Sequence, residues 1–342
     1  MRIAVTTAPG TMSVRDAPVP RAQPGQALIA VEAVGLCGSD FHLLDGTHPY
    51  ARFPQTQGHE FAGVVTDFGA GYHGPLEPGQ RVAVEPLVPC GACFACRRGR
   101  YNCCSDLKVM GAHIPGALAE YVTVRTDALH PVGDLDAACS ALVEPVSIGL
   151  QAVNRAGIVS GDTVVVLGAG PIGLAVTLGS VDRGARVLVA DRVPTRLARA
   201  RTFGAQCVVD TSETGLDAAV TQWTGGDGAA VVVDATGVPA LIRSAFDLVA
   251  PSGTIVVVGI SDQEVSIPVI EFSRKEVTVL GSRNNAGIFP AAVDLVRRHA
   301  DTARTLITHT SPLARVPEAI RYAADHPAQV GKAIITVGAT AS

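Results

Sequence analysis

The chain has 342 residues, of which 47% are hydrophobic and 17% are charged, and its formal net charge is −4. A chain of this length is longer than a single hydrophobic core usually accommodates, so two domains are expected. The small net charge and the lack of a basic block argue against a nucleic-acid or anionic-membrane binder. No apolar run approaches the ~18 residues of a membrane span, and the first residues lack the apolar core of a signal peptide. A cytoplasmic protein is therefore expected.

The first 150 residues have a β-rich, irregular texture. Short strand-like runs occur at 27–36, 61–69 and 81–88, and Pro/Gly clusters at 21–26 and 74–80 interrupt them. This pattern predicts a domain of short strands joined by turns.

From about residue 160 the texture changes to β-branched, nearly continuous apolar runs, typical of parallel strands buried on both faces. They are found at 163–168, 186–191, 205–210, 229–236 and 254–260. Helix-length segments alternate with them, at 171–185, 193–205 and 239–250. This alternation predicts a doubly wound α/β sheet. Two helical patterns and a last strand follow, at 289–300, 316–326 and 332–337, and composition leaves open which domain they join.

A glycine-rich motif follows the first of these strands, in the order Gly168-Ala169-Gly170-Pro171-Ile172-Gly173. Such a turn lets backbone approach a pyrophosphate at a helix N-terminus, so it predicts dinucleotide binding. The next strand ends in Asp191, where a carboxylate binds the ribose hydroxyls and repels a 2′-phosphate. NAD is thus favoured over NADP, although the neighbouring Arg192 weakens that preference. A turn that binds no nucleotide is the alternative, and the strand, helix and acid in register argue against it.

Five of the eight cysteines fall within residues 90–104. Cys90, Cys93, Cys96 and Cys104 have the C-x2-C-x2-C-x7-C spacing, which predicts a closed tetrahedral zinc site with a structural role. Disulfides are rare in a reducing compartment, so metal binding is the leading explanation. A zinc ribbon that binds DNA or a partner through Arg97, Arg98 and Arg100 is the alternative.

A closed site leaves no position for substrate, so the chemistry must lie elsewhere. Two segments offer candidates, GLCGSDFH at 35–42 and QGHEFAG at 57–63. Taken alone, each is ambiguous, because a single buried cysteine or histidine is more often a core residue than a ligand.

Together these segments, the cysteine group and the glycine motif resemble the zinc-dependent alcohol and polyol dehydrogenases of the medium-chain dehydrogenase/reductase superfamily. The resemblance covers essentially the whole chain. It implies a GroES-like catalytic domain formed by 1–150 and 288–342, and a Rossmann NAD-binding domain formed by 151–287. It also implies a homo-oligomer, either a dimer or a tetramer.

The resemblance further implies two zinc ions per chain. The catalytic ion would be held by Cys37 and His59, with Glu60 as an adjoining or exchanging carboxylate ligand and with Glu144 bound to the zinc or to its water. The structural ion would be held by Cys90, Cys93, Cys96 and Cys104. Ser39 and His42 match a proton relay that runs through the cofactor ribose. The NAD contacts would be Gly168, Gly170, Ile172, Gly173, Asp191 and Arg196. Cys103 stays unassigned, and Cys139 is interpreted as a core residue.

The position of Glu144 resembles the sorbitol, L-threonine and sugar dehydrogenase branches, where other branches have a cysteine. The segment at 275–285 resembles branches that act on sugars, sugar acids or polyols, and Arg283 and Asn284 could face such a substrate or brace the loop. The predicted activity is NAD-linked oxidation of a secondary alcohol in a small hydroxylated substrate. The alternatives are an L-threonine-type amino-alcohol dehydrogenase and, from another class, a non-catalytic nucleotide-binding or zinc-lobe interaction protein.

Overall fold

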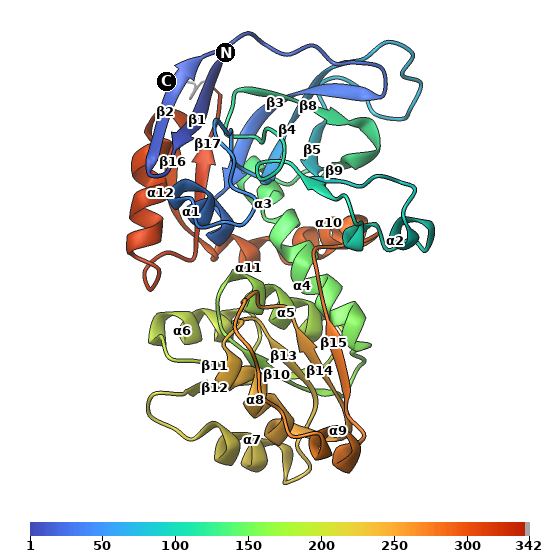
Figure 1. Cartoon of the computed structure of the whole chain (residues 1–342), viewed down its shortest axis with the longest axis vertical. Helices are drawn as coiled ribbons and strands as arrows, with labels where there is room; N and C mark the ends of the chain where they lie inside the picture. The colour runs from blue at the N-terminus through green and yellow to red at the C-terminus, as the bar shows by residue number, and fades with distance from the viewer. Residues whose placement is uncertain (339–342) are drawn as a thin grey trace. The chain divides into compact units, whose positions relative to one another are not determined.

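The computed structural model describes residues 1–338, and Figure 1 shows its elements. The chain divides into two compact units. One is formed by Met1–Glu144 with the chain from Phe289 onward, and the other by Pro145–Ile288. The last four residues of the expected segment 288–342 lie outside the described residues. Within residues 1–338, the helices are too short or too polar to cross a membrane.

A seven-stranded sheet organises the first unit, with strand order β16-β17-β3-β4-β5-β9 and with β8 paired to β3. The strands are β3 (Gln26–Gly35), β4 (Glu60–Phe68), β5 (Arg81–Val84), β8 (Tyr121–Arg125), β9 (Leu129–Pro131), β16 (Ile307–Pro312) and β17 (Lys332–Thr336). Because β17 pairs antiparallel with β3, the end of the chain completes the sheet that the beginning of the chain starts. Two further pairs are β1 (Arg2–Ala8) with β2 (Thr11–Asp16), and β6 (Leu87–Val88) with β7 (Lys108–Val109).

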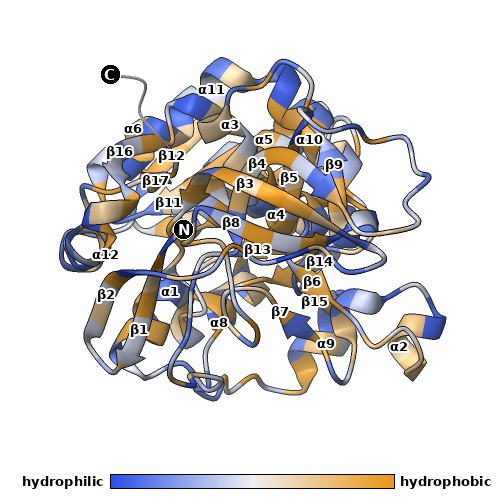
Figure 2. Cartoon of the chain, turned by 90° about the horizontal axis from the view of Figure 1, so that it is seen from above, coloured by the Kyte–Doolittle hydropathy of each residue, from blue (hydrophilic) through white to orange (hydrophobic). Residues whose placement is uncertain are grey.

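The sequence of β3 explains its central place in that sheet. Every second side chain, including Ala27, Ile29 and Val31, is buried, as expected for a strand with one face on the core. At the end of the strand Val34 and Gly35 are buried as well, so both faces of β3 are covered there, next to the first residue of β4. Figure 2 shows the largely hydrophobic colouring of β3, β4 and β5.

Helices surround this sheet and the irregular segments beside it. They are α1 (Gly38–Asp45), α2 (Phe94–Arg97), α3 (Ala137–Ala141), α10 (Phe289–Arg298), α11 (Ala300–Arg304) and α12 (Val316–Asp325), with short 3-10 turns at Tyr101–Cys103, Thr126–Ala128 and Leu313–Arg315. The division between the units falls inside α4 (Val143–Ala156), after Glu144. Cys139 in α3 is fully buried, which confirms its interpretation as a core residue.

The second unit is a parallel sheet in the order β12-β11-β10-β13-β14-β15. Its strands are β10 (Thr163–Leu167), β11 (Arg186–Asp191), β12 (Cys207–Asp210), β13 (Ala229–Asp234), β14 (Val249–Val257) and β15 (Thr278–Gly281). The helices are α5 (Pro171–Asp182), α6 (Pro194–Thr202), α7 (Leu216–Thr224), α8 (Pro239–Leu248) and α9 (Ile270–Lys275). The strand order reverses direction beside β10, and dinucleotides bind at such a switch point.

Candidate active site

A thiol, an imidazole and a carboxylate meet where β3 ends and β4 begins. The ligand atoms of Cys37, His59 and Glu60 all lie within 4.8 Å of one another. The strand pairing explains the meeting, because Gly35 at the end of β3 faces Glu60 at the start of β4. These three ligand types are the ones that zinc takes in proteins. The buried Nδ1 atom of His59 has no hydrogen-bond partner among the described residues, which fits an ion-binding role for this ring.

Two neighbours on α1 flank the His59 ring. Its Nε2 atom lies 3.4 Å from the Ser39 hydroxyl, and its Nδ1 atom lies 4.0 Å from a carboxylate oxygen of Asp40. The Asp40 carboxylate is too far from Nδ1 for a hydrogen bond, so it acts on the ring through its charge. Burial lowers the pKa of His59, but Asp40 and Cys37 outweigh it and hold this pKa well above its ordinary value.

Asp40 is one of the candidates that the GLCGSDFH segment offers, but sequence reasoning gave it no specific role; the structure places it beside His59. It is fully buried and accepts hydrogen bonds from the backbone N–H groups of Cys37, at 2.9 Å, and Gly58, at 3.3 Å. Burial raises the pKa of Asp40, and His59 opposes this effect. The signal for Asp40 was its position three residues after Cys37, where an acidic side chain caps the start of a helix.

Glu60 is paired with a residue that sequence reasoning also missed. The amine of Lys332, at the start of β17, lies 2.7 Å and 2.6 Å from the two carboxylate oxygens of Glu60. Both side chains are buried. No local pattern indicated this pair, because the two residues are 272 positions apart.

Glu144, near the start of α4, is buried close enough to this group to interact with it electrostatically. Burial raises the pKa of Glu144 to about 7, while His59 lowers it and Glu60 raises it. Glu144 is not a member of the three-residue group with ligand atoms within 4.8 Å. Its carboxylate therefore interacts electrostatically with the site, but unlike that of Glu60 it lies outside the set of atoms close enough to share one metal ion.

The two proposed relay residues, Ser39 and His42, both lie on α1. The Ser39 hydroxyl faces the His59 ring, whereas the exposed His42 has its Nδ1 atom 3.0 Å from the hydroxyl of Thr47. One residue is thus beside the possible metal ligands, and the other is in contact with solvent. This arrangement suits the two ends of a proton path.

Arg283 and Asn284 follow β15 in the second unit, whereas the Cys37 group lies in the first. The backbone of Asn284 has φ of +46°, the left-handed conformation that asparagine adopts in turns. The next residue, Asn285, is fully buried, and both polar atoms of its side chain lack a hydrogen-bond partner among the described residues. Sequence reasoning did not single out Asn285.

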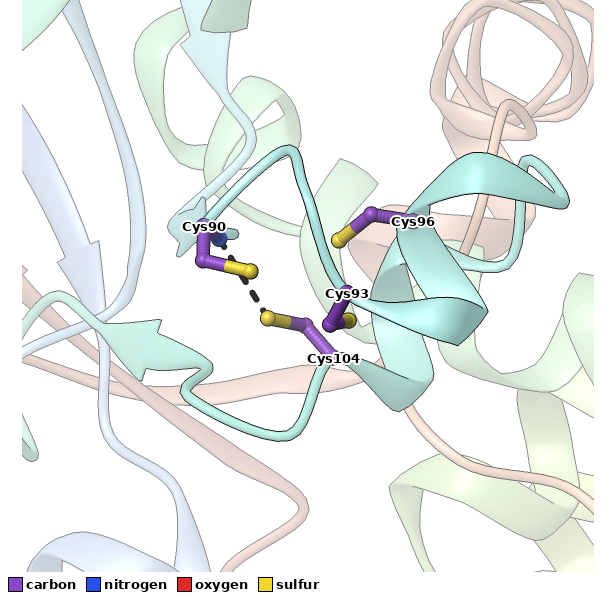
Figure 3. Close-up of side chains that lie close together, drawn as sticks. All are labelled: Cys90, Cys93, Cys96 and Cys104. Carbon is purple, nitrogen blue, oxygen red and sulfur yellow. Dashed lines mark hydrogen bonds between the residues drawn. The ribbon is translucent and has the colours of Figure 1, made fainter.

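The four cysteines with ligand spacing form a second group of converging side chains. The sulfur atoms of Cys90, Cys93, Cys96 and Cys104 lie within 4.8 Å of one another and point toward a common centre (Figure 3). Backbone N–H groups of Cys96 and Ser105 lower the pKa of Cys93 to about 5. Burial and the neighbouring thiols raise the pKa of Cys96 to about 12. Four thiolates so close need a cation, and four protein ligands close the coordination sphere. Cys103 is exposed and lies outside this group.

The glycine motif forms an open cradle at the start of α5. A Cβ atom on Gly173 would lie 1.8 Å from the carbonyl oxygen of Gly168, so this position has no room for a side chain. A Cβ atom on Gly170 would meet nothing within 4 Å, which leaves space for a ligand above the helix N-terminus. Gly168 has φ of +98°, a conformation that glycine adopts readily. The cradle fits a pyrophosphate bound by backbone N–H groups.

Asp191 closes one side of this cradle. One of its carboxylate oxygens accepts a hydrogen bond from the N–H of Ala169 at 2.7 Å, and the other accepts from Arg192 and Val193 at 2.8 Å and 2.9 Å. The guanidinium of Arg196 lies 3.9 Å from the carboxylate. Asp191 thus shapes the glycine loop, and its contact with a ribose stays a prediction.

Comparisons with known proteins agree with this geometry. Residues 23–134 match the alcohol dehydrogenase GroES-like domain, and residues 171–298 match the zinc-binding dehydrogenase family. The L-galactonate-5-dehydrogenase of Escherichia coli (strain K12) is 36% identical over 323 residues, which are 94% of each protein. The chain belongs to the zinc-dependent alcohol and polyol dehydrogenase family.

Further relatives of this dehydrogenase extend the comparison. The D-altritol 5-dehydrogenase of Agrobacterium fabrum is 34% identical over 314 residues, which are 90% of this chain and 91% of the relative. An alcohol dehydrogenase of Escherichia coli CFT073, solved in complex with NADH, is 31% identical. It has a TM-score of 0.92 and covers 98% of this chain and 99% of that one.

Membership of the family confirms several predictions. The fold is a GroES-like domain with a Rossmann domain, and the protein is an oxidoreductase of the zinc-binding alcohol dehydrogenase type. The alternative of a non-catalytic binding protein is set aside. The family match does not assign individual residues, so the ligand sets above remain predictions.

Replacing Asp191 with Ser is expected to raise the Kd of this dehydrogenase for NAD about tenfold or more and to reduce its preference over NADP. The change removes charged hydrogen bonds that each contribute ~1.5–3 kcal/mol, and it removes the repulsion of a 2′-phosphate. Titration calorimetry with both cofactors measures the effect, and Asp217→Ser, at an exposed position on α7, is the control. An unchanged cofactor preference would show that Asp191 does not contact the ribose.

Proposed function

We propose that this dehydrogenase oxidises the secondary hydroxyl at carbon 5 of a hexitol or hexonate to a ketone. The reaction reduces NAD⁺ to NADH and releases one proton. The proposal rests on the convergence of Cys37, His59 and Glu60, whose side chains are of the types that bind zinc in proteins. The choice of carbon 5 is supported by two similar proteins, named L-galactonate-5-dehydrogenase and D-altritol 5-dehydrogenase.

In the proposed site, Cys37 and His59 hold the catalytic zinc together with Glu144 or a water bound to it, and Glu60 stands beside the ion as a carboxylate that can exchange onto it. The four-cysteine group holds a second, structural zinc. When bound, zinc supplies a Lewis acid that lowers the pKa of a substrate hydroxyl, and NAD supplies the hydride acceptor. The buried Asp40 carboxylate lies 4.0 Å from the His59 ring and adds negative charge beside it.

The chain's own proton path begins at Ser39. Its hydroxyl, beside His59, accepts the proton of the substrate hydroxyl and passes its own proton onward. His42 is exposed, so its imidazole can pass a proton to water. Ser39 thus takes the proton at the substrate, and His42 releases a proton to solvent.

A substrate panel tests the proposed function. The purified protein is incubated with NAD⁺ and with hexitols, hexonates, shorter polyols and L-threonine, and NADH absorbance is followed. We expect turnover with a hexitol or hexonate and, by NMR of the product, a ketone at carbon 5. A ketone at another carbon would refute the regiochemistry. Preferential oxidation of L-threonine would favour the amino-alcohol branch, which the buried Glu144 also fits.

We propose that the protein is a homo-oligomer that pairs through β15. This strand stands last in its sheet order, and its side chains are largely exposed. Exposed apolar side chains accompany it, among them Val279 at 41%, Ile270 at 59% and Val269 at 83% exposure. An edge strand of this kind is a ready surface for a second copy of the same chain.

Val279→Lys is expected to lower the mass of the particle in solution, because a charged side chain on an edge strand opposes pairing. Size-exclusion chromatography with light scattering measures the mass. Val159→Lys, at a position with 60% exposure elsewhere in the same unit, is the matched control. A wild-type protein with the mass of one chain would refute the proposed oligomer.

We propose a cytoplasmic location for the enzyme. The eight cysteines are free thiols, and zinc binding through thiolates is favoured where disulfide formation is suppressed. Cell fractionation followed by immunodetection tests this, and recovery of the protein outside the cytoplasm would contradict it.

A further inference from the structure

The ion pair between Glu60 and Lys332 is buried inside the candidate zinc site. The Lys332 side chain is 3% exposed and that of Glu60 is 1% exposed. The amine donates to both carboxylate oxygens, at 2.7 Å and 2.6 Å, and to the carbonyl oxygen of Leu36 at 3.2 Å. An ammonium has three donors, so Lys332 uses its full capacity on these three acceptors.

The sheet is shaped to hold this pair. Glu60 begins β4, Lys332 begins β17, and β3 lies between them with Gly35 at its end. A Cβ atom on Gly35 would lie 2.4 Å from a carboxylate oxygen of Glu60. Glycine at this position therefore leaves the space that the Glu60 carboxylate occupies while it is bound by Lys332.

The pair has two consequences for a metal at this site. First, an oxygen of Glu60 lies within 4.8 Å of the ligand atoms of Cys37 and His59, yet both of its oxygens are engaged by Lys332. Lys332 thus competes with a metal for this carboxylate. Second, the positively charged amine of Lys332 lies beside the group of side chains that could bind the metal, so it opposes the approach of a cation to Glu60.

The charge of the buried Lys332 amine is balanced by the Glu60 carboxylate that it contacts with both oxygens. An unpaired charge in such a buried place would be strongly destabilising.

We propose that Lys332 is a positioning residue that holds Glu60 back from the catalytic zinc and keeps one coordination position open for substrate. This inference rests on the proposed zinc site at Cys37 and His59. Without the lysine, the Glu60 carboxylate becomes free to bind the metal, and the positive charge that repels the metal is lost. Both changes strengthen metal binding and reduce the ability of the metal to polarise a substrate.

The test replaces Lys332 with Met, which has a similar length and no charge. The catalytic zinc is exchanged for Co²⁺, whose visible spectrum reports the number and type of its ligands. We expect Lys332→Met to change this spectrum and to slow the release of the catalytic metal to a chelator by about tenfold or more, a size typical for groups that support metal ligands. The kcat for alcohol oxidation is expected to fall at the same time.

Three further variants make the test specific. Lys332→Arg keeps the charge and the carboxylate contact, so its spectrum and metal release are expected to match the wild type. The double variant Lys332→Met with Glu60→Gln lacks the freed carboxylate, so its spectrum is expected to return toward that of the wild type. If Lys332→Met does not fold, Lys332→Gln retains a hydrogen-bond donor without the charge and is measured in its place.

The outcomes separate this inference from the proposed function. If the wild-type protein binds no metal that Cys37→Ala loses, the proposed zinc site itself is wrong. If that site is present and Lys332→Met or Lys332→Gln keeps the wild-type Co²⁺ spectrum and metal release, the inference about Lys332 is overturned. A changed spectrum that persists in the double variant would also overturn it, because Glu60 would not be the new ligand.

Discussion

His59→Ala is expected to reduce kcat/KM for alcohol oxidation by about a thousandfold or more, while the Kd for NAD stays unchanged. Loss of the imidazole removes a ligand from the catalytic metal, and a Lewis acid contributes several kcal/mol of transition-state stabilisation, where 1.36 kcal/mol is tenfold in rate. The NAD cradle belongs to the other unit, so its backbone contacts are expected to survive the change. Steady-state kinetics and titration calorimetry measure the two effects.

A matched control separates a specific effect on the metal from the general loss of a histidine. His73 is exposed and lies in the same unit, so His73→Ala is expected to retain wild-type kinetics. Metal analysis should show one zinc fewer in His59→Ala and the full content in His73→Ala. If His59→Ala retains its turnover, the metal-dependent mechanism fails.

Cys93→Ser is expected to remove one zinc per chain and to lower the melting temperature by roughly ten degrees, because structural zinc binding contributes directly to folding. The segment around it has little else to hold it together. Its hydrophobic cluster has only Leu87, Cys104 and Leu107 as buried members, so the metal must replace a core. Metal analysis and thermal unfolding followed by circular dichroism measure the two effects.

The neighbouring Cys103 offers the control for this experiment. It is exposed and stands outside the group of four converging thiols, so Cys103→Ser should keep both zinc ions and the wild-type melting temperature. Equal zinc loss in the two variants would contradict the assignment of the ligand set. A Cys93→Ser protein with unchanged stability would show that the lobe folds without its metal.

The boundary between α8 and β14 shows where patterns in the sequence stop being sufficient. The apolar pattern predicts a helix-length segment at 239–250 and a strand from 254, whereas α8 ends at Leu248 and β14 begins at Val249. The amine of Lys275, more than twenty residues later, donates to the carbonyl oxygens of Phe246 and Val249, at 2.8 Å and 2.7 Å. A distant side chain therefore satisfies the last carbonyls of the helix, and no local signal indicates this.

The sequence by itself determined the features that depend on short spacings. The strand-and-helix alternation of the second unit, the glycine cradle and the four converging cysteines each lie within a few tens of residues. Their geometry follows from local backbone structure, and periodicity and spacing report it directly. The match of the chain to its family agrees with the fold class and cofactors predicted in this way.

The tertiary structure alone decided the surroundings of the catalytic group. Composition left open which domain the last segment joins, and the pairing of β17 with β3 brings Lys332 to Glu60 across 272 residues. Asp40 lies in the site because the segment that leads into β4 passes beside α1. Gly58 in that segment donates a backbone hydrogen bond to Asp40, and His59 lies 4.0 Å from its carboxylate. Charges that are buried must find partners inside the fold, and strand order, which local sequence does not encode, determines which partners are near.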